Sequence, residues 1–298
     1  MKKIILAGAL IGVALLADTK TITPYLGAIS YDSSTAKSLK DSAKLGGFYT
    51  SIGNLNYLFE LSYTYLNINY KSGALENLKQ HDIVAKYGKY TKNYAISGGL
   101  HYINNNEKNT FKDLGDGFTA IIGAEAYKWY NYNKLSYGVD VYYSRYADAH
   151  TDSSLASTTT VDLWQFTPKL SFSKAINVNT RNTVSAKINY IKANDYKTSS
   201  YTSYELSDTL GYKSFFATLK YNGGKMRSGV KDGGMTVYNT KDLLRNAYSA
   251  TLGYYFTPTL EASIAYSRNN YEEYDAATLS LLPEGTSSTA LISLSYTY

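Results

Sequence analysis

The sequence predicts an all-β fold, namely a closed antiparallel barrel that crosses a membrane with about fourteen strands. First, apolar and polar residues alternate with a period of two in segments spread over nearly the whole chain, as in strands with one apolar and one polar face. Second, Tyr occurs 33 times, and its ring and hydroxyl suit both strands and the boundary between membrane and water. Third, no segment beyond the N-terminal region holds the roughly 18 consecutive apolar residues of a spanning helix.

The N-terminal residues have the layout of a secretory signal peptide. Lys2 and Lys3 form a short basic start, residues 4–16 are uncharged and apolar, and the small residue Ala17 follows. The apolar stretch is too short for a spanning helix, which needs about 20 residues. We therefore expect residues 1–17 to be a signal peptide and residues 18–298 to form the barrel. An uncleaved membrane anchor is the alternative.

The alternating pattern defines thirteen strands, and parity suggests one more. The thirteen are expected at 22–31, 42–52, 55–70, 79–90, 93–103, 117–130, 134–147, 161–173, 182–192, 210–222, 246–257, 259–271 and 288–298. Both chain ends should lie on one side of the membrane, so the strand number should be even. The Gly-rich stretch 223–239 is poorly patterned but long enough to cross once, which gives fourteen. Twelve is the alternative, if two weak hairpin partners fuse or stay outside the membrane.

The final segment, 288–298, has the clearest alternation. Ile292, Leu294 and Tyr296 share one face, mostly polar residues share the other, and the segment ends on Tyr298. This resembles the closing strand of bacterial outer-membrane barrels, a broad class rather than one family. The resemblance implies that Tyr298 is an assembly signal for the barrel-insertion machinery. It also implies that the chain lies in the outer membrane, in contact with its lipid.

Short and long connections are expected to alternate. Tight turns are expected at 53–54, 131–133 and 257–259, and we place them in the periplasm. Longer polar stretches, placed outside the cell, are expected at 32–41, 71–78, 104–116, 148–160, 193–209 and 272–287.

Charged residues are expected on the lumen face of the strands. The candidates are Glu60, Lys86, Glu125, Asp140, Lys169, Lys187, Lys220 and Glu261, because a Lys or Arg facing lipid near mid-membrane costs about 2–4 kcal/mol. Lys187 and Lys220 are expected on neighbouring strands on either side of the connection 193–209. A barrel of this size has room for water, so these charges would set a weak ion selectivity. Alternatively they form ion pairs that stiffen the wall.

The sequence offers little for catalysis or cofactors. His101 shares the inward face of its strand with Ser97, but no flanking motif completes a catalytic triad. Cys is absent, which excludes thiolate chemistry and metal–sulfur sites. Glu107, Asp113 and Asp116 lack the spacing of a calcium loop. We expect no enzyme activity, no cofactor and no bound metal. The formal charge of +6 is scattered, so nucleic acid is not an expected partner.

These observations favour a porin-like channel for passive diffusion of ions and small hydrophilic solutes. A barrel with a plugged lumen, whose outer loops bind a partner as adhesins do, is the alternative. An outer-membrane lipid hydrolase is a distant third. Assembly into homo-oligomers is compatible with the sequence, which carries no signature for or against it.

Overall fold

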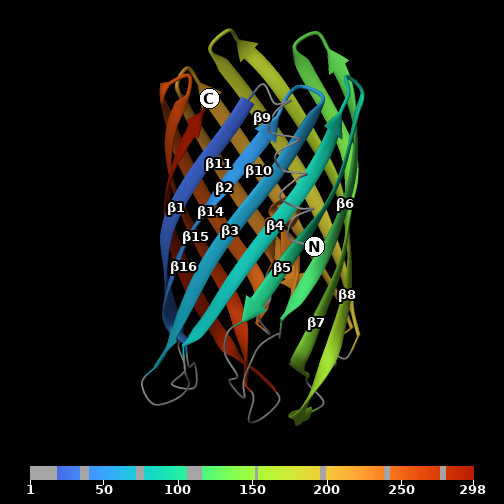
Figure 1. Ribbon diagram of the computed structural model, residues 1–298, viewed down its shortest axis with the longest axis vertical. Coiled ribbons are helices and arrows are strands. Elements are labelled where there is room, and N and C mark those ends of the chain that lie inside the picture. Colours follow the sequence, from blue (N-terminus) through green and yellow to red (C-terminus); the bar gives the residue numbers. More distant parts are fainter. Residues whose placement is uncertain are drawn as a thin grey trace, which may run out of the picture.

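Fourteen strands form one closed antiparallel barrel, which confirms the predicted fold class and strand number. The computed structural model describes residues 19–33, 40–71, 77–105, 116–151, 154–194, 199–237, 242–275 and 280–298. The barrel strands are β1 (Thr19–Ser33), β2 (Lys40–Gly53), β3 (Tyr57–Tyr70), β4 (Leu78–Tyr90), β5 (Tyr94–Asn105), β6 (Gly117–Tyr130), β7 (Asn133–Thr151), β8 (Ser154–Asn177), β9 (Thr180–Ala193), β10 (Ser200–Tyr212), β11 (Phe215–Met226), β14 (Leu243–Thr257), β15 (Leu260–Asp275) and β16 (Ser280–Thr297). Strand β1 pairs with β16, so the sheet closes on itself (Figure 1).

The alternating pattern sorts the side chains of each strand to the two faces of the barrel. Large apolar side chains on the outer face are highly exposed, for example Leu26 (64%), Ile122 (67%) and Leu219 (62%). A surface of this kind suits lipid contact, since a soluble protein rarely exposes large apolar patches. The inner face carries many of the polar and charged side chains, such as Asp140 and Lys187.

Short turns lie at one end of the barrel, the end where β1 and β16 pair near Lys20 and Tyr298. The connections there span residues 54–56, 91–93, 131–132, 178–179, 213–214 and 258–259. Polar side chains shape several of them: Asn54 Oδ1 accepts the backbone N–H of Asn56 at 2.9 Å and of Tyr57 at 3.2 Å, which is an Asx turn. We call this the short-turn end. At the other end most connections are longer, but only residues 152–153 separate β7 from β8.

One predicted connection is a strand. The stretch 193–209 was expected as a loop, but most of it lies in β10, and a tight turn at 213–214 interrupts the expected strand 210–222. Tyr204 and Leu206 face outward, 42% and 49% exposed, whereas Ser203 and Glu205 are buried on the inner face. The Ser, Thr and Tyr content of this stretch masked its alternation. Expected connections 148–160 and 272–287 are also shorter, because β7, β8, β15 and β16 extend into them.

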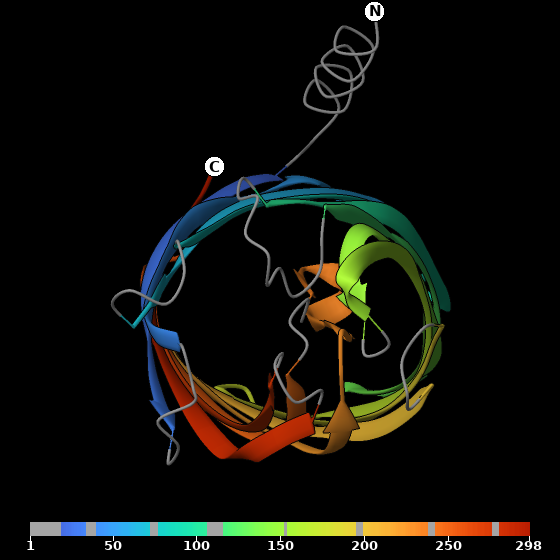
Figure 2. The same ribbon diagram turned by 90° about the horizontal axis from the view of Figure 1, so that it is seen from below.

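The Gly-rich stretch 223–239 does not cross the membrane, so the fourteenth strand is β10 instead. Strand β11 ends at Met226, and residues 227–237 turn into the barrel, where Figure 2 shows them inside the ring of strands. They form β12 (Val230–Lys231), a short 3-10 turn η1 (Asp232–Gly234) and β13 (Thr236–Val237). We call residues 227–237 the insert.

Beneath the insert the inner wall is apolar. Val230 and Val237 of the insert pair with each other and pack on inward side chains of the wall, including Ile121, Ile191 and Leu244. All five are less than 9% exposed. This burial holds the insert against the wall by the hydrophobic effect, at roughly 25 cal/mol per Å² of apolar surface removed from water.

The signal peptide expected at 1–17 lies outside the described residues, as do Glu107 and Asp113, for which the sequence gives no calcium-loop spacing. Within the described residues, none of the helices has the length and apolar character needed to span a bilayer.

Candidate functional site

The candidate functional site is the lumen of the barrel, which is lined by the insert and by the part of the inner wall that the insert leaves uncovered. Gln165 of β8 fixes the insert at its first strand. Its side-chain Oε1 accepts the N–H of Val230 and its Nε2 donates to the Val230 carbonyl, both at 2.8 Å. The amide thereby satisfies both backbone polar groups of Val230 as a neighbouring strand would, where an unpaired group would be costly. Gln165 is 3% exposed.

His101 of β5 anchors the 3-10 turn. Its Nδ1 lies 2.9 Å from the carbonyl oxygen of Gly234, and the side chain is fully buried. Since a carbonyl only accepts, Nδ1 carries the proton here. Position 234 requires glycine, because its φ is +97° and a Cβ would collide with the Ile121 side chain. On the far side of the ring, Nε2 lies 4.0 Å from Asp82 Oδ2.

An ion pair holds the tip of the insert. Lys220 Nζ of β11 lies 3.0 Å from Asp232 Oδ1. Burial inside the barrel opposes ionisation of the Asp232 carboxyl, but the charges of Lys220, Lys231 and Lys187 outweigh it, and its pKa falls below the ordinary value. Asp232 is therefore a carboxylate near neutral pH and holds Lys220 by charge as well as by hydrogen bonding.

Charged side chains form ion pairs around the lumen. We call this set of residues the charge belt: Glu60, Lys86, Glu125, Asp140, Lys169, Lys187, Glu205, Lys220 and Asp232. Lys86 lies 3.3 Å from Glu60. Lys169 lies 2.8 Å from Asp140 and 3.5 Å from Glu125. Lys187 lies 2.8 Å from Glu205. Each predicted lysine thus has a carboxylate partner.

Several belt residues retain contact with solvent, although Asp140 and Glu205 are buried. The side chains of Lys169 and Lys187 are 24% and 27% exposed, and that of Glu125 is 25% exposed. The two lysines also stand directly opposite each other on β8 and β9. Their like charges are tolerable because each ammonium has its own carboxylate. The belt therefore presents alternating charges to the lumen rather than one sign.

One sequence expectation about these charges needs correction. Lys187 and Lys220 are not on neighbouring strands, since β10 lies between β9 and β11. Glu261 of β15 shares the inner face with Ser263, but no Lys or Arg within the described ranges forms an ion pair with it. The sequence pattern does not point to Glu205 or Asp232, because it predicts a loop at 193–209 and a strand at 223–239. The period-two alternation of 200–212 was the signal for Glu205.

Hydroxyl groups line the inner wall on the side where the barrel closes. Thr21 and Thr297 lie 2.9 Å apart, as do Thr23 and Ser295. These side-chain pairs join β1 to β16 on the inner face. A wall of hydroxyl groups is neutral and wettable, in contrast to the apolar wall beneath the insert.

The arrangement offers no assembled catalytic centre among the described residues. His101 uses Nδ1 on Gly234 and is fully buried, so it is not placed to take a proton from a solute. No group of three or more His, Asp or Glu side chains in the described ranges could hold a metal ion.

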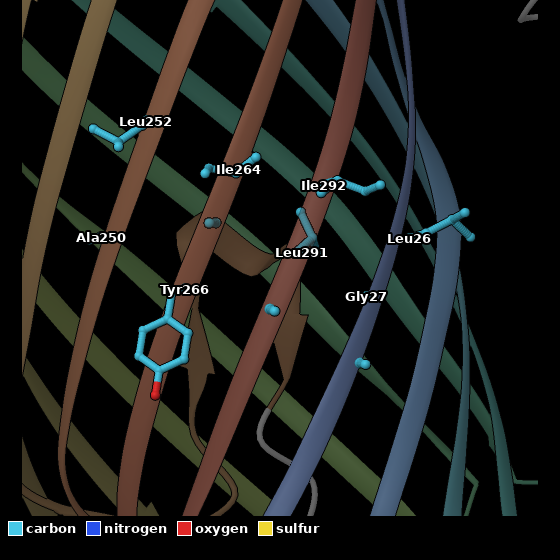
Figure 3. A pocket seen from close by; sticks show the side chains of 11 residues that line it. Leu26, Gly27, Ala250, Leu252, Ile264, Tyr266, Leu291 and Ile292 are labelled. Atoms are coloured by element: carbon cyan, nitrogen blue, oxygen red, sulfur yellow. The ribbon is translucent and has the colours of Figure 1, made fainter.

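An apolar depression of about 600 Å³ lies on the outer face, over β1, β14, β15 and β16 (Figure 3). It is bordered by outward side chains such as Leu26, Leu252, Ile264 and Ile292. The surface is hollow here because three small residues lie in one row across the strands. Ala28 stands opposite Ala290, and Ala250 follows in the same row on the other side of Tyr266. This surface belongs to the lipid-facing outer face of the barrel and not to the lumen.

Comparison with known proteins shows the fold. No protein-family model matches the chain, and no curated protein matches its sequence. Among solved structures, the toluene transporter TodX of Pseudomonas putida has a TM-score of 0.52 at 10% identity, covering 96% of this chain and 91% of that one. A FadL homologue of Pseudomonas aeruginosa has a TM-score of 0.51 at 12% identity, with 94% and 89% covered. The outer membrane protein Omp33 of Acinetobacter baumannii has a TM-score of 0.50 at 10% identity, with 94% and 99% covered.

The chain therefore has the fold of bacterial outer-membrane β-barrels, and its exposed apolar outer face suits contact with lipid.

Proposed function

We propose that this barrel is a channel through which ions and small hydrophilic solutes diffuse passively, and that the insert narrows it. The observation that supports the proposal is the difference between the two parts of the inner face. The apolar inward side chains are buried beneath the insert, whereas the charge belt and the hydroxyl wall remain partly exposed. Groups of this kind replace the hydration of a polar solute.

A channel for apolar solutes is the second candidate. It is favoured by the apolar cluster on the inner wall, and TodX, one of the similar structures, is a toluene transporter. In this chain, however, the cluster residues are covered: Ile103, Ile191 and Met226 are at most 1% exposed. An apolar solute would need the insert to move before it met this wall.

The alternative of a plugged barrel that binds a partner through its outer loops is favoured by the insert itself, which occupies part of the lumen.

Single-channel recording in planar bilayers tests these candidates. We expect discrete current steps from the purified protein, and larger steps from a variant in which residues 227–241 are replaced by a short Gly-Ser linker. The point variant Gln165→Leu, which only weakens the seating of the insert, provides a milder test if the deletion fails to fold. Absence of current from the parent protein, with current from the deletion variant, would favour the plugged barrel. Steps of equal size in both would contradict the role of the insert.

A further inference from the structure

A second hollow lies inside the short-turn end of the barrel and has a different chemistry from the charge belt. It measures about 620 Å³ and is lined by residues from β4 and its following turn, from β6 and its following turn, and from β7: Tyr90, Thr91, Lys92, Tyr127, Trp129, Asn131 and Lys134. Tyr127 and Trp129 follow Glu125 at period two, so they share its inward face. We call this the mouth pocket.

The aromatic side of the mouth pocket is held in place. The Trp129 indole N–H donates to the Lys92 carbonyl oxygen at 3.0 Å, which ties β6 to the turn between β4 and β5. The ring nevertheless remains 45% exposed. A fixed, accessible indole offers a flat surface on which a ring can stack at little entropic cost.

The cations of the mouth pocket lack the partners that the belt lysines have. Lys134 Nζ lies 4.8 Å from the ring centre of Tyr127 and 5.8 Å from that of Trp129. Within the part of the chain that the structure describes, no carboxylate pairs with Lys134 or Lys92. Each belt lysine, by contrast, lies within 3.3 Å of a carboxylate. Two lysines that have no carboxylate partner in the described ranges therefore lie beside exposed aromatic surface.

We propose that the mouth pocket binds small carboxylates that bear a ring with an apolar face. The ring stacks on Trp129 and the carboxylate meets the ammonium of Lys134, with Lys92 at the rim. Two sources share this chemistry: aromatic acids, whose ring is a π-system, and acidic sugars, whose pyranose has an apolar C–H face. As a solute site at a channel mouth, the proposal rests on the proposed function. It also specifies the class of solute that would bind at this end of the barrel.

Tryptophan fluorescence tests the proposal on the full-length barrel in detergent. The chain has two tryptophans, and the other, Trp164, lies on the outer face, 57% exposed. The variant Trp164→Phe therefore leaves Trp129 as the only reporter. The probes are benzoate and glucuronate, with benzyl alcohol and glucose as their neutral counterparts. We expect a saturable change with at least one carboxylate and a much weaker change with its neutral counterpart.

The matched variants are Lys134→Ala and Lys128→Ala in the Trp164→Phe background. Lys128 lies on the same strand but on the outer face, with its Nζ 5.4 Å from the Tyr130 ring centre. Loss of a charge-assisted contact should weaken binding by about tenfold in Lys134→Ala, Lys134→Arg should largely restore it, and Lys128→Ala should leave it unchanged. Heat-modifiable migration in gels verifies folding of each variant.

Three outcomes would overturn the site: no saturable change with either carboxylate, equal binding of the neutral counterparts, or equal binding by Lys134→Ala and Lys128→Ala. The binding assay does not depend on conductance. Binding without any current would contradict the channel function but not the binding site. Current without binding would contradict the binding site but not the channel function.

Discussion

The Nδ1 atom of His101 lies 2.9 Å from the carbonyl oxygen of Gly234, although 133 residues separate the two in the chain. The contact joins a barrel strand to the insert, within a wall that excludes water. It acts with the Gln165 amide and the Lys220–Asp232 pair. Three contacts from three strands therefore hold the insert in one position.

The first prediction concerns this anchor. Replacing His101 with Phe keeps much of the volume but leaves the Gly234 carbonyl without its donor, which should weaken the seating of the insert by about 1–3 kcal/mol. Seating is measured with a Val237→Cys reporter, since the chain has no cysteine and Val237 is 8% exposed. A water-soluble thiol reagent should label the reporter faster in the His101→Phe background. His81, whose Nδ1 lies 2.8 Å from the Tyr63 hydroxyl, provides the control: His81→Phe should not change the rate. Equal rates in both variants would contradict the anchor.

The insert also marks the limit of prediction from this sequence. The alternation on each strand is a local property, so it located most strands and the outward positions such as Leu170 and Ile264. The stretch 223–239 had no such period, and parity alone made it a strand. Its inward path depends on contacts with Gln165, His101 and Ile121, which lie far away in the chain. No local pattern reports contacts of this kind.

The charge belt was predictable in part for the same reason. Lys169 and Lys187 lie on well-patterned strands, so their shared face follows from period two. Their partners were harder to find, because pairing depends on register between strands: Glu205 stands opposite Lys187 only once β10 exists. The mouth pocket could not be predicted because it combines turn residues such as Lys92 with side chains of three strands, β4, β6 and β7.

The second prediction is the pH dependence of the Lys220–Asp232 pair. The pKa of Asp232 is depressed in the folded state. The stabilisation of the insert by the ion pair is therefore fully present above the ordinary carboxyl pKa of 3.8, and it is lost as the pH falls through the lower, folded pKa. In the Val237→Cys reporter, adding Asp232→Asn should raise the labelling rate relative to the reporter alone. The ratio of the two rates should stay constant between about pH 5 and 8. A factor that shrinks toward 1 as the pH falls from 8 to 5 would show that the pair is lost in that range.

The third prediction separates the two faces of the wall. Single cysteines at Leu170, Ile188 and Leu252 should resist a water-soluble thiol reagent in membranes, because these side chains are outward and more than half exposed to the apolar surroundings. Cysteines at the inward neighbours Ser171 and Gly253 should react if water fills the lumen. Lys213, in a short turn, provides a reactive positive control. Equal labelling of both faces would contradict the barrel in the membrane.

The fourth prediction concerns assembly. Tyr298 stacks on Tyr296 with ring centres 5.8 Å apart, and its backbone pairs with Lys20 where the barrel closes. If Tyr298 is recognised by the insertion machinery, Tyr298→Asp should reduce the folded protein in the outer membrane severely. Tyr132→Asp, in an exposed turn, should not. The amount of heat-modifiable protein in membrane fractions measures both, and wild-type yield from Tyr298→Asp would remove the signal role.

The last prediction concerns ion selectivity. Each of Lys187 and Lys220 neutralises one carboxylate, Glu205 and Asp232 respectively, so Lys187→Gln with Lys220→Gln frees two negative charges in the lumen. A charge acting through water contributes roughly 1 kcal/mol at about 4 Å, and salt screens it over about 10 Å at 0.1 M. We therefore expect a modest shift of the reversal potential toward cations at low salt, which fades at about 1 M, where the screening length is near 3 Å. Lys128→Gln, on the outer face, is the control. An unchanged reversal potential with normal conductance would mean that these pairs only stiffen the wall, and the belt would then have no part in selecting ions.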